Sequence, residues 1–132
     1  MEYIRIGGKV WNVRILEVKE SFNILDTENG GRVISEGEMT LDRIGTFYGH
    51  TVTFGKADID HRSEFDDLFI YLSLPRNTGI DVELVHNQST IAYKAYTSTG
   101  ERKIGWIDRD NNIVNWLNFS CNLIPMKAQV TP

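Results

Sequence analysis

Apolar and polar residues alternate along most of this chain, and a period of two predicts β-strands rather than helices. The clearest example is the segment 80–85, in which acidic residues stand between apolar ones. Turn residues separate such stretches, as in 26–31, where Asn-Gly and Gly-Gly tolerate the positive φ angles of hairpins. Gly45 and Gly49 are expected to frame a bend. The expected strands lie at about 3–6, 10–18, 32–41, 51–54, 80–85, 91–96, 104–107 and 113–124.

One stretch has the period of a helix instead. Four apolar residues at i, i+3, i+4 and i+7 share one helical face: Phe65, Leu68, Phe69 and Leu72. Pro75 ends this helix, which is expected at about 61–74. The candidates for its N-cap are Asp58, Asp60 and Ser63.

These patterns together predict a mainly β fold, a β-sandwich or barrel of about seven to eight strands with one intercalated α-helix. A single domain is expected over residues 1–125. Residues 126–132 are expected to form a loose C-terminal tail.

Charge and composition exclude several classes of protein. The formal net charge is −4 and the pI about 5.3, and no run of basic residues is present. Specific nucleic-acid binding is therefore not expected, because phosphate contacts need clustered Lys and Arg. No stretch approaches about 18 apolar residues, and the N-terminus lacks the pattern of a signal peptide, so neither a membrane span nor secretion is expected. These features favour a protein that is made in the cytoplasm.

No catalytic, cofactor-binding or metal-binding arrangement stands out. The three histidines are scattered, without the spacing of a zinc site. Asp58, Asp60 and His61 could contact a metal ion, but helix capping and solvation explain them better. The segment 108–112 begins like a calcium loop, yet isoleucine and phenylalanine follow where such a loop needs glycine and glutamate, so a turn is expected.

The single cysteine, Cys121, cannot form an internal disulfide. It lies in an apolar strand, so we expect a buried side chain whose pKa is raised. No nucleophile, phosphate-binding or dinucleotide motif is present, and the chain is expected not to be an enzyme. An enzyme of unrecognised type remains a further hypothesis, because the fold does not decide the function.

The aromatic residues allow two interpretations. A group of them could form a sugar-stacking platform: Trp11, Tyr93, Tyr96, Trp106 and Trp116. Tryptophan beside valine, isoleucine and leucine on a strand is more often a core residue, because it buries a large area there. We favour the core.

The segment 31–45 resembles part of a known family. Gly31-Arg32 precedes a segment with Met39 and Asp42-Arg43, and a Thr/Val strand follows at 51–54. A helix that ends at Pro75 comes next, and Trp116-Leu117-Asn118-Phe119 matches a closing strand. In these features the chain resembles small tail proteins of long-tailed bacteriophages and prophages, which share a tail-tube-like β-sandwich. The segments 47–50 and 80–97 depart from the pattern, which leaves open the tail component: tube, tube-initiating ring, terminator or baseplate-proximal protein.

The resemblance implies a structural subunit that forms rings, commonly of six copies, and contacts other phage tail proteins. Sheet edges and the hairpin around 29–30 would join the copies, and an acidic inner wall would let DNA pass. The protein would be made in the host cytoplasm and located in the tail of the virion. The candidate assembly interface comprises Asn29, Gly30, Glu36, Glu38, Met39, Leu41, Asp42, Arg43 and Ile44.

Two readings of these residues and of the function stay open. The interface residues could equally form an ordinary exposed strand with alternating charge. The alternative function is a carbohydrate- or receptor-binding module that uses the aromatic residues on one sheet face.

Overall fold

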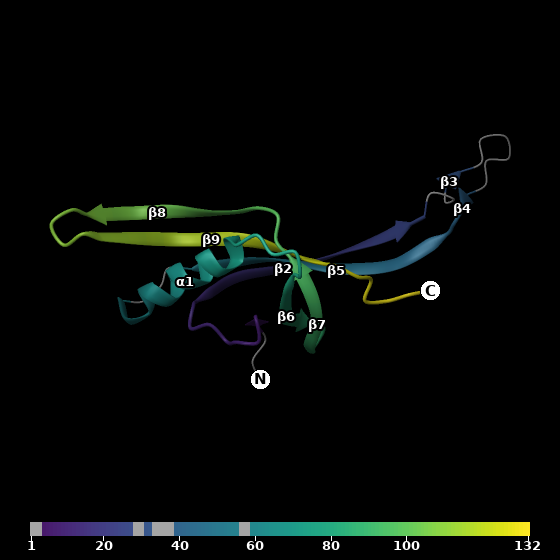
Figure 1. The fold of residues 1–132 in the computed structure, drawn as a ribbon, viewed down its shortest axis with the longest axis horizontal. Helices are drawn as coiled ribbons and strands as arrows, with labels where there is room; N and C mark the ends of the chain where they lie inside the picture. The colour runs from purple at the N-terminus through teal and green to yellow at the C-terminus, as the bar shows by residue number, and fades with distance from the viewer. Residues whose placement is uncertain (1–3, 28–30, 33–38, 56–58) are drawn as a thin grey trace.

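The computed structural model describes residues 4–27, 31–32, 39–55 and 59–132 (Figure 1). The elements in chain order are β1 (Arg5–Ile6), β2 (Ile15–Asp26), β3 (Gly31–Arg32), β4 (Met39–Thr40), β5 (Arg43–Gly55), η1 (Ile59–His61), α1 (Arg62–Ser73), β6 (Ile80–His86), β7 (Ser89–Tyr96), β8 (Gly100–Asp108) and β9 (Ile113–Pro125). The predicted fold class is confirmed, because the described residues are mostly β and contain a single α-helix. No described helix is long and apolar enough to span a membrane.

The strands form two layers that join at one corner. The first layer has the order β8-β9-β5-β2 and the second the order β1-β6-β7, with every pair antiparallel. The layers meet where Ala95 pairs with Pro125 and Tyr96 with Ile124. In Figure 1 the hairpins β8–β9 and β2–β5 extend in opposite directions, and β6–β7 crosses the middle of the molecule.

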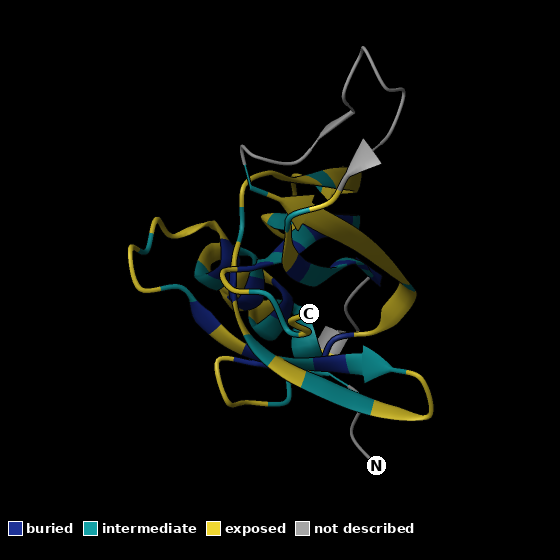
Figure 2. Ribbon diagram, turned by 90° about the vertical axis from the view of Figure 1, so that its right-hand side faces the viewer, coloured by how far each residue is buried: buried dark blue, intermediate teal, exposed yellow. Residues whose placement is uncertain are grey.

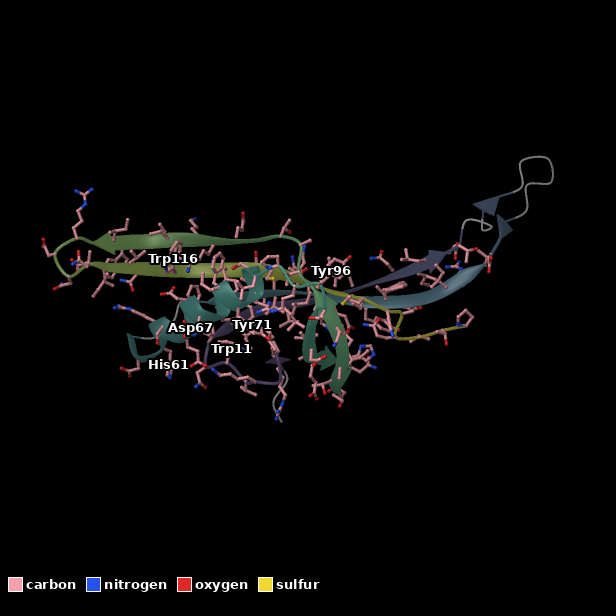
Figure 3. The ribbon with its side chains drawn as sticks, viewed as in Figure 1. Trp11, His61, Asp67, Tyr71, Tyr96 and Trp116 are labelled. Atoms are coloured by element: carbon pink, nitrogen blue, oxygen red, sulfur yellow. The ribbon has the colours of Figure 1, made fainter. Side chains whose placement is uncertain are left out.

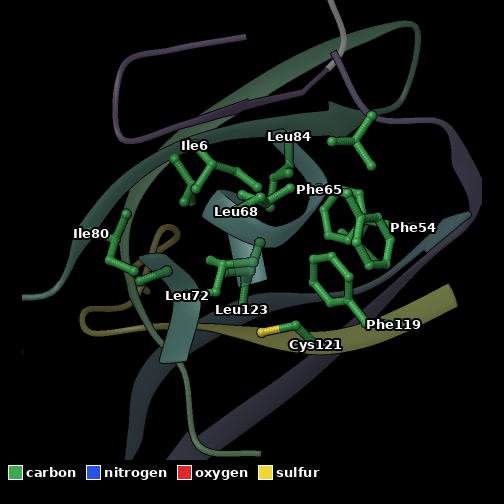
Figure 4. Packing of buried hydrophobic residues seen from close by; sticks show 14 residues of the cluster. Ile6, Phe54, Phe65, Leu68, Leu72, Ile80, Leu84, Phe119, Cys121 and Leu123 are labelled. Carbon is green, nitrogen blue, oxygen red and sulfur yellow. The ribbon is translucent and has the colours of Figure 1, made fainter. Parts of the chain in front are cut away.

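Helix α1 packs into the core between the layers (Figure 4). Its residues Phe65, Leu68 and Leu72 are buried, as the helical period predicts. The ring of Phe119 lies 4.7 Å from that of Phe54 and 5.1 Å from that of Phe65, so the helix and both central strands share one aromatic contact. Exposed residues dominate β2 and β8, the outer strands of the hairpins that project from this centre (Figure 2).

The helix ends as predicted, whereas its N-cap is neither Asp60 nor Ser63. Leu74 is extended, with ψ 133, because a proline disfavours the helical conformation in the residue before it. The N-cap is His61, and it makes no side-chain capping bond. Ser63 lies inside the helix, and Asp58 lies outside the described residues.

Two strands differ from their predicted bounds. The predicted strand at 10–18 begins only at Ile15 and continues to Asp26, because β2 pairs with β5 over that whole length. The predicted bend at Gly45 and Gly49 is wrong, since β5 runs straight through both. Gly45 instead marks a close approach, because a Cβ there would lie 2.7 Å from the Cβ of Ala128.

The C-terminal tail is paired rather than loose. The Thr46 amide donates to the Val130 carbonyl over 2.8 Å, and the Gln129 amide donates to the Thr46 carbonyl over 3.0 Å. The side chain of Gln129 also bonds both the amide and the carbonyl of Tyr48, each at 3.0 Å. The tail therefore lies along β5 on the side opposite β2.

Candidate functional site

The first layer ends in two open edges. Among the described residues, β2 pairs with β5 alone and β8 with β9 alone. Each outer edge therefore presents backbone N–H and C=O groups that are available to another strand. Open edges of this length invite pairing between chains.

Exposed apolar side chains follow both edges. Along β2 these are Ile15, Leu16, Phe22, Ile24 and Leu25, with Phe22 exposed to 64%. On β8 they are Ile104, Trp106 and Ile107, with Trp106 exposed to 50%. Exposed apolar patches of this kind mark contact surfaces.

The face of this layer that points away from α1 carries a polar stretch across all four strands. One row of cross-strand partners crosses all four strands: Glu17, Thr53, Ser120 and Glu101. In the next row Thr51, the partner of Lys19, donates a hydrogen bond to Asn122 Oδ1 over 2.9 Å. Lysines at 19 and 103 offset glutamates at 17 and 101, so this polar stretch is balanced in charge. The acidic wall that the resemblance implies is not found on this face.

The charges at the two edges repeat one motif. Edge β2 carries Glu17 and Lys19, and edge β8 carries Glu101 and Lys103, with one residue between the members of each pair. Since β8 and β2 run in opposite directions within the layer, the edges of two equally oriented copies would meet antiparallel. In that pairing Glu17 can stand opposite Lys103 while Lys19 stands opposite Glu101.

Several residues of the predicted interface lie beyond the described chain. These are Asn29, Gly30, Glu36 and Glu38. Met39 lies in β4, where it pairs with Arg32 of β3. Leu41 and Ile44 are exposed, to 56% and 45%, and join the apolar surface of the β2–β5 hairpin.

The two charged residues of this segment have partners in their own chain. Asp42 accepts a hydrogen bond from the Thr27 hydroxyl. Arg43 forms an ion pair with Asp26, with 3.1 Å between Nε and Oδ1. Both contacts tie the end of β2 to the start of β5, so these side chains first stabilise the hairpin.

The aromatic residues make separate contacts, and Trp11, Tyr96 and Trp116 lie apart from one another in Figure 3. Trp11 stands against Tyr71 of α1 and donates from Nε1 to the Ile6 carbonyl. Trp116 lies beneath the guanidinium of Arg102 on β8. These two tryptophans pack against the core as predicted, whereas Trp106 is exposed and the core interpretation is wrong for it.

The remaining candidates for chemistry are the metal-ligating side chains, the turn at 108–112 and Cys121. Among the described residues, no group of three such side chains is arranged to hold a metal ion. Asp108 accepts hydrogen bonds from the Asn111 side chain and from the Asp110 amide, and the first of these is the main cause that lowers the pKa of this carboxyl. The predicted turn at 108–112 is thus confirmed. Burial raises the pKa of Cys121 to about 11, as its strand position predicts.

The sequence analysis did not identify β2 and β8 as the open edges of the layer. The signal was present in the repeated Glu-x-Lys motif at 17–19 and 101–103, and in the exposed apolar residues beside it. Only the layer order shows that both copies of this motif lie on outer strands.

The chain matches no family model and no curated protein sequence.

Proposed function

We propose that the chain is a non-enzymatic structural subunit of a bacteriophage or prophage tail. Copies of it join into a closed ring, β2 of one copy beside β8 of the next. The observation that carries this proposal is the pair of open edges on one four-stranded layer, which have complementary charges and exposed apolar side chains. The resemblance of the segment 31–45 to tail proteins supplies the biological setting, the tail of a virion made in a bacterial cytoplasm.

Edge pairing between copies also accounts for the apolar residues. In the register that opposes Glu17 to Lys103, Leu16 and Ile104 come to the same level, and both are exposed in the single chain. Because edges β2 and β8 differ, the contact is heterologous and closes by rotation. A closed sheet has no edge left to aggregate.

The balanced polar face would then line the inside or the outside of the ring. Its hydroxyl and amide groups, among them Thr53, Ser120 and Asn122, carry no charge. Without clustered Lys or Arg such a wall gains no counterion release from DNA. A lumen lined by this face would therefore let DNA slide.

The register is tested by reversing and restoring one charge pair. The variant Lys103→Glu places two carboxylates opposite each other at every interface, and like charges across a strand pair are destabilising by up to about 1 kcal/mol per contact. The double variant Glu17→Lys with Lys103→Glu restores the attraction. We expect the single variant to lose the assembled species and the double variant to regain it, measured by light scattering over a concentration series with negative-stain images.

A matched control changes the same charge away from the edges. Lys94→Glu lies on β7, where Lys94 has only an exposed ion pair with Asp81. This variant should assemble like the unaltered protein. An unaltered protein that stays monomeric at every concentration would contradict ring formation, and a double variant that fails to recover would contradict the register.

A further inference from the structure

A polar cluster lies where the β2–β5 hairpin meets the β6–β7 hairpin. His50 of β5 is its centre, and its side chain is fully buried. The Nε2 atom lies 2.9 Å from the Val85 carbonyl and 3.1 Å from Oε2 of Glu20. The Nδ1 atom lies 2.7 Å from the hydroxyl of Tyr93.

A second histidine shares the same carboxylate oxygen. Nδ1 of His86, at the end of β6, lies 2.7 Å from Oε2 of Glu20 on β2. The His86 ring also stands against that of Tyr48, with 4.8 Å between centroids. One carboxylate therefore joins two imidazoles from two different hairpins.

The neighbours of His50 can satisfy its hydrogen bonds in both the neutral and the charged state of the ring. Its Nε2 faces two atoms that can only accept, so this nitrogen carries a hydrogen. In the neutral ring Nδ1 accepts from the Tyr93 hydroxyl. In the charged ring Nδ1 donates to Tyr93, whose hydroxyl hydrogen then turns to the Leu123 carbonyl, 3.3 Å away.

The charged state makes the larger number of contacts. It adds the bond from Tyr93 to Leu123, and it places a cation beside the Glu20 carboxylate. Hydrogen bonds between charged partners are about twice as strong as neutral ones. Tyr93 remains a hydroxyl throughout, because burial and then the charge of Glu20 raise its pKa.

We propose that Glu20, His50, His86 and Tyr93 form a proton-operated clasp that holds the β6–β7 hairpin against the β2–β5 hairpin. The groups that face it are Glu20 from β2, His50 and Tyr48 from β5, His86 from β6 and Tyr93 from β7. Histidine gains or loses its proton between about pH 5 and 8. The clasp is tight while the imidazoles are charged and the Glu20 carboxylate is ionised, and it loosens as the imidazoles lose their protons.

The clasp belongs to the single chain and does not depend on ring assembly. Its consequence for assembly does rest on the proposed function. Glu20 lies on β2, so the clasp sets how firmly this edge is held for a neighbouring copy.

The test compares Glu20→Gln with the unaltered protein at about pH 5.5 and about pH 8. The amide keeps the shape and a hydrogen-bond acceptor but removes the charge. We expect the folded-to-unfolded ratio, from urea titration, to fall roughly tenfold more at the lower pH than at the higher, since only charged imidazoles lose an ion pair. The matched control Asp67→Asn, an exposed carboxylate on α1, should show the same small change at both pH values.

Ring nitrogen NMR of His50 tests the proton itself. In the unaltered protein Nδ1 should gain a hydrogen as the pH is lowered. Tyr93→Phe removes the acceptor of that hydrogen and should shift this gain to lower pH, whereas Tyr96→Phe, on the exposed end of β7, should not. An equal loss of stability at both pH values, or a His50 ring unchanged by Tyr93→Phe, would overturn the clasp.

Discussion

Position on a strand decides the chemistry of Cys121. Alternate residues of β9 point to the same face, so Cys121 shares the buried side with Phe119 and Leu123. The surrounding apolar side chains disfavour the charged thiolate, and the pKa rises to about 11. A free thiol would reach half ionisation near pH 8.5.

We expect Cys121 to resist alkylation at about pH 8. Its thiolate fraction there is lower than that of an ordinary cysteine by a factor on the order of a hundred, and burial hinders the reagent as well. Thiol titration with a coloured disulfide reagent should show slow reaction in the native protein and rapid reaction in urea. The rate should rise as the pH approaches 11. A native rate equal to that in urea would contradict the buried position.

At the scale of the element, β5 continues through its glycines at 45 and 49 because it has partners on both sides. β2 pairs with it on one side, and β9 and the C-terminal tail pair with it on the other. The predicted bend at Gly45 was wrong because glycine is suited both to turns and to sites where another backbone approaches closely. The local sequence could not show that Val130 and Ala128 would lie against it.

Gln129→Ala should release the tail from β5. It removes two hydrogen bonds to the Tyr48 backbone, at a cost of about 1–2 kcal/mol. Hydrogen exchange should speed up at the Tyr48 and Thr46 amides and remain unchanged at β6. Lys127→Ala, an exposed change in the same segment, is the control and should leave both unaffected. Unchanged exchange in Gln129→Ala would show that the Thr46–Val130 pairing alone holds the tail.

At the scale of the whole molecule, one core joins helix and both layers. Buried residues of α1 contact strands that are distant in the sequence, and Leu68 is completely buried. The projecting hairpins add area but little core (Figure 2). The molecule should therefore unfold as one cooperative unit.

Leu68→Ala should destabilise the fold by about 2–5 kcal/mol, because it leaves a cavity between α1 and the sheets. Ile70→Ala, on the same helix but 53% exposed, should cost less than about 1 kcal/mol. Circular dichroism in the far and near ultraviolet should report one shared urea midpoint for each variant. Separate midpoints for helix and aromatic signals would contradict a single core.

The sequence by itself determined the fold class, the helix, the buried thiol and the turn at 108–112. These depend on local periodicity and on the chemistry of neighbouring residues, such as the spacing of Phe65 and Leu72 or the proline that follows the helix. The tertiary structure alone decided which strands became outer edges, where β2 and β5 began and ended, and that His50 would meet Glu20 and Tyr93. Those outcomes depend on pairing between distant segments, in which a strand's length follows its partner and the face of a side chain follows the register. No local pattern contains that information.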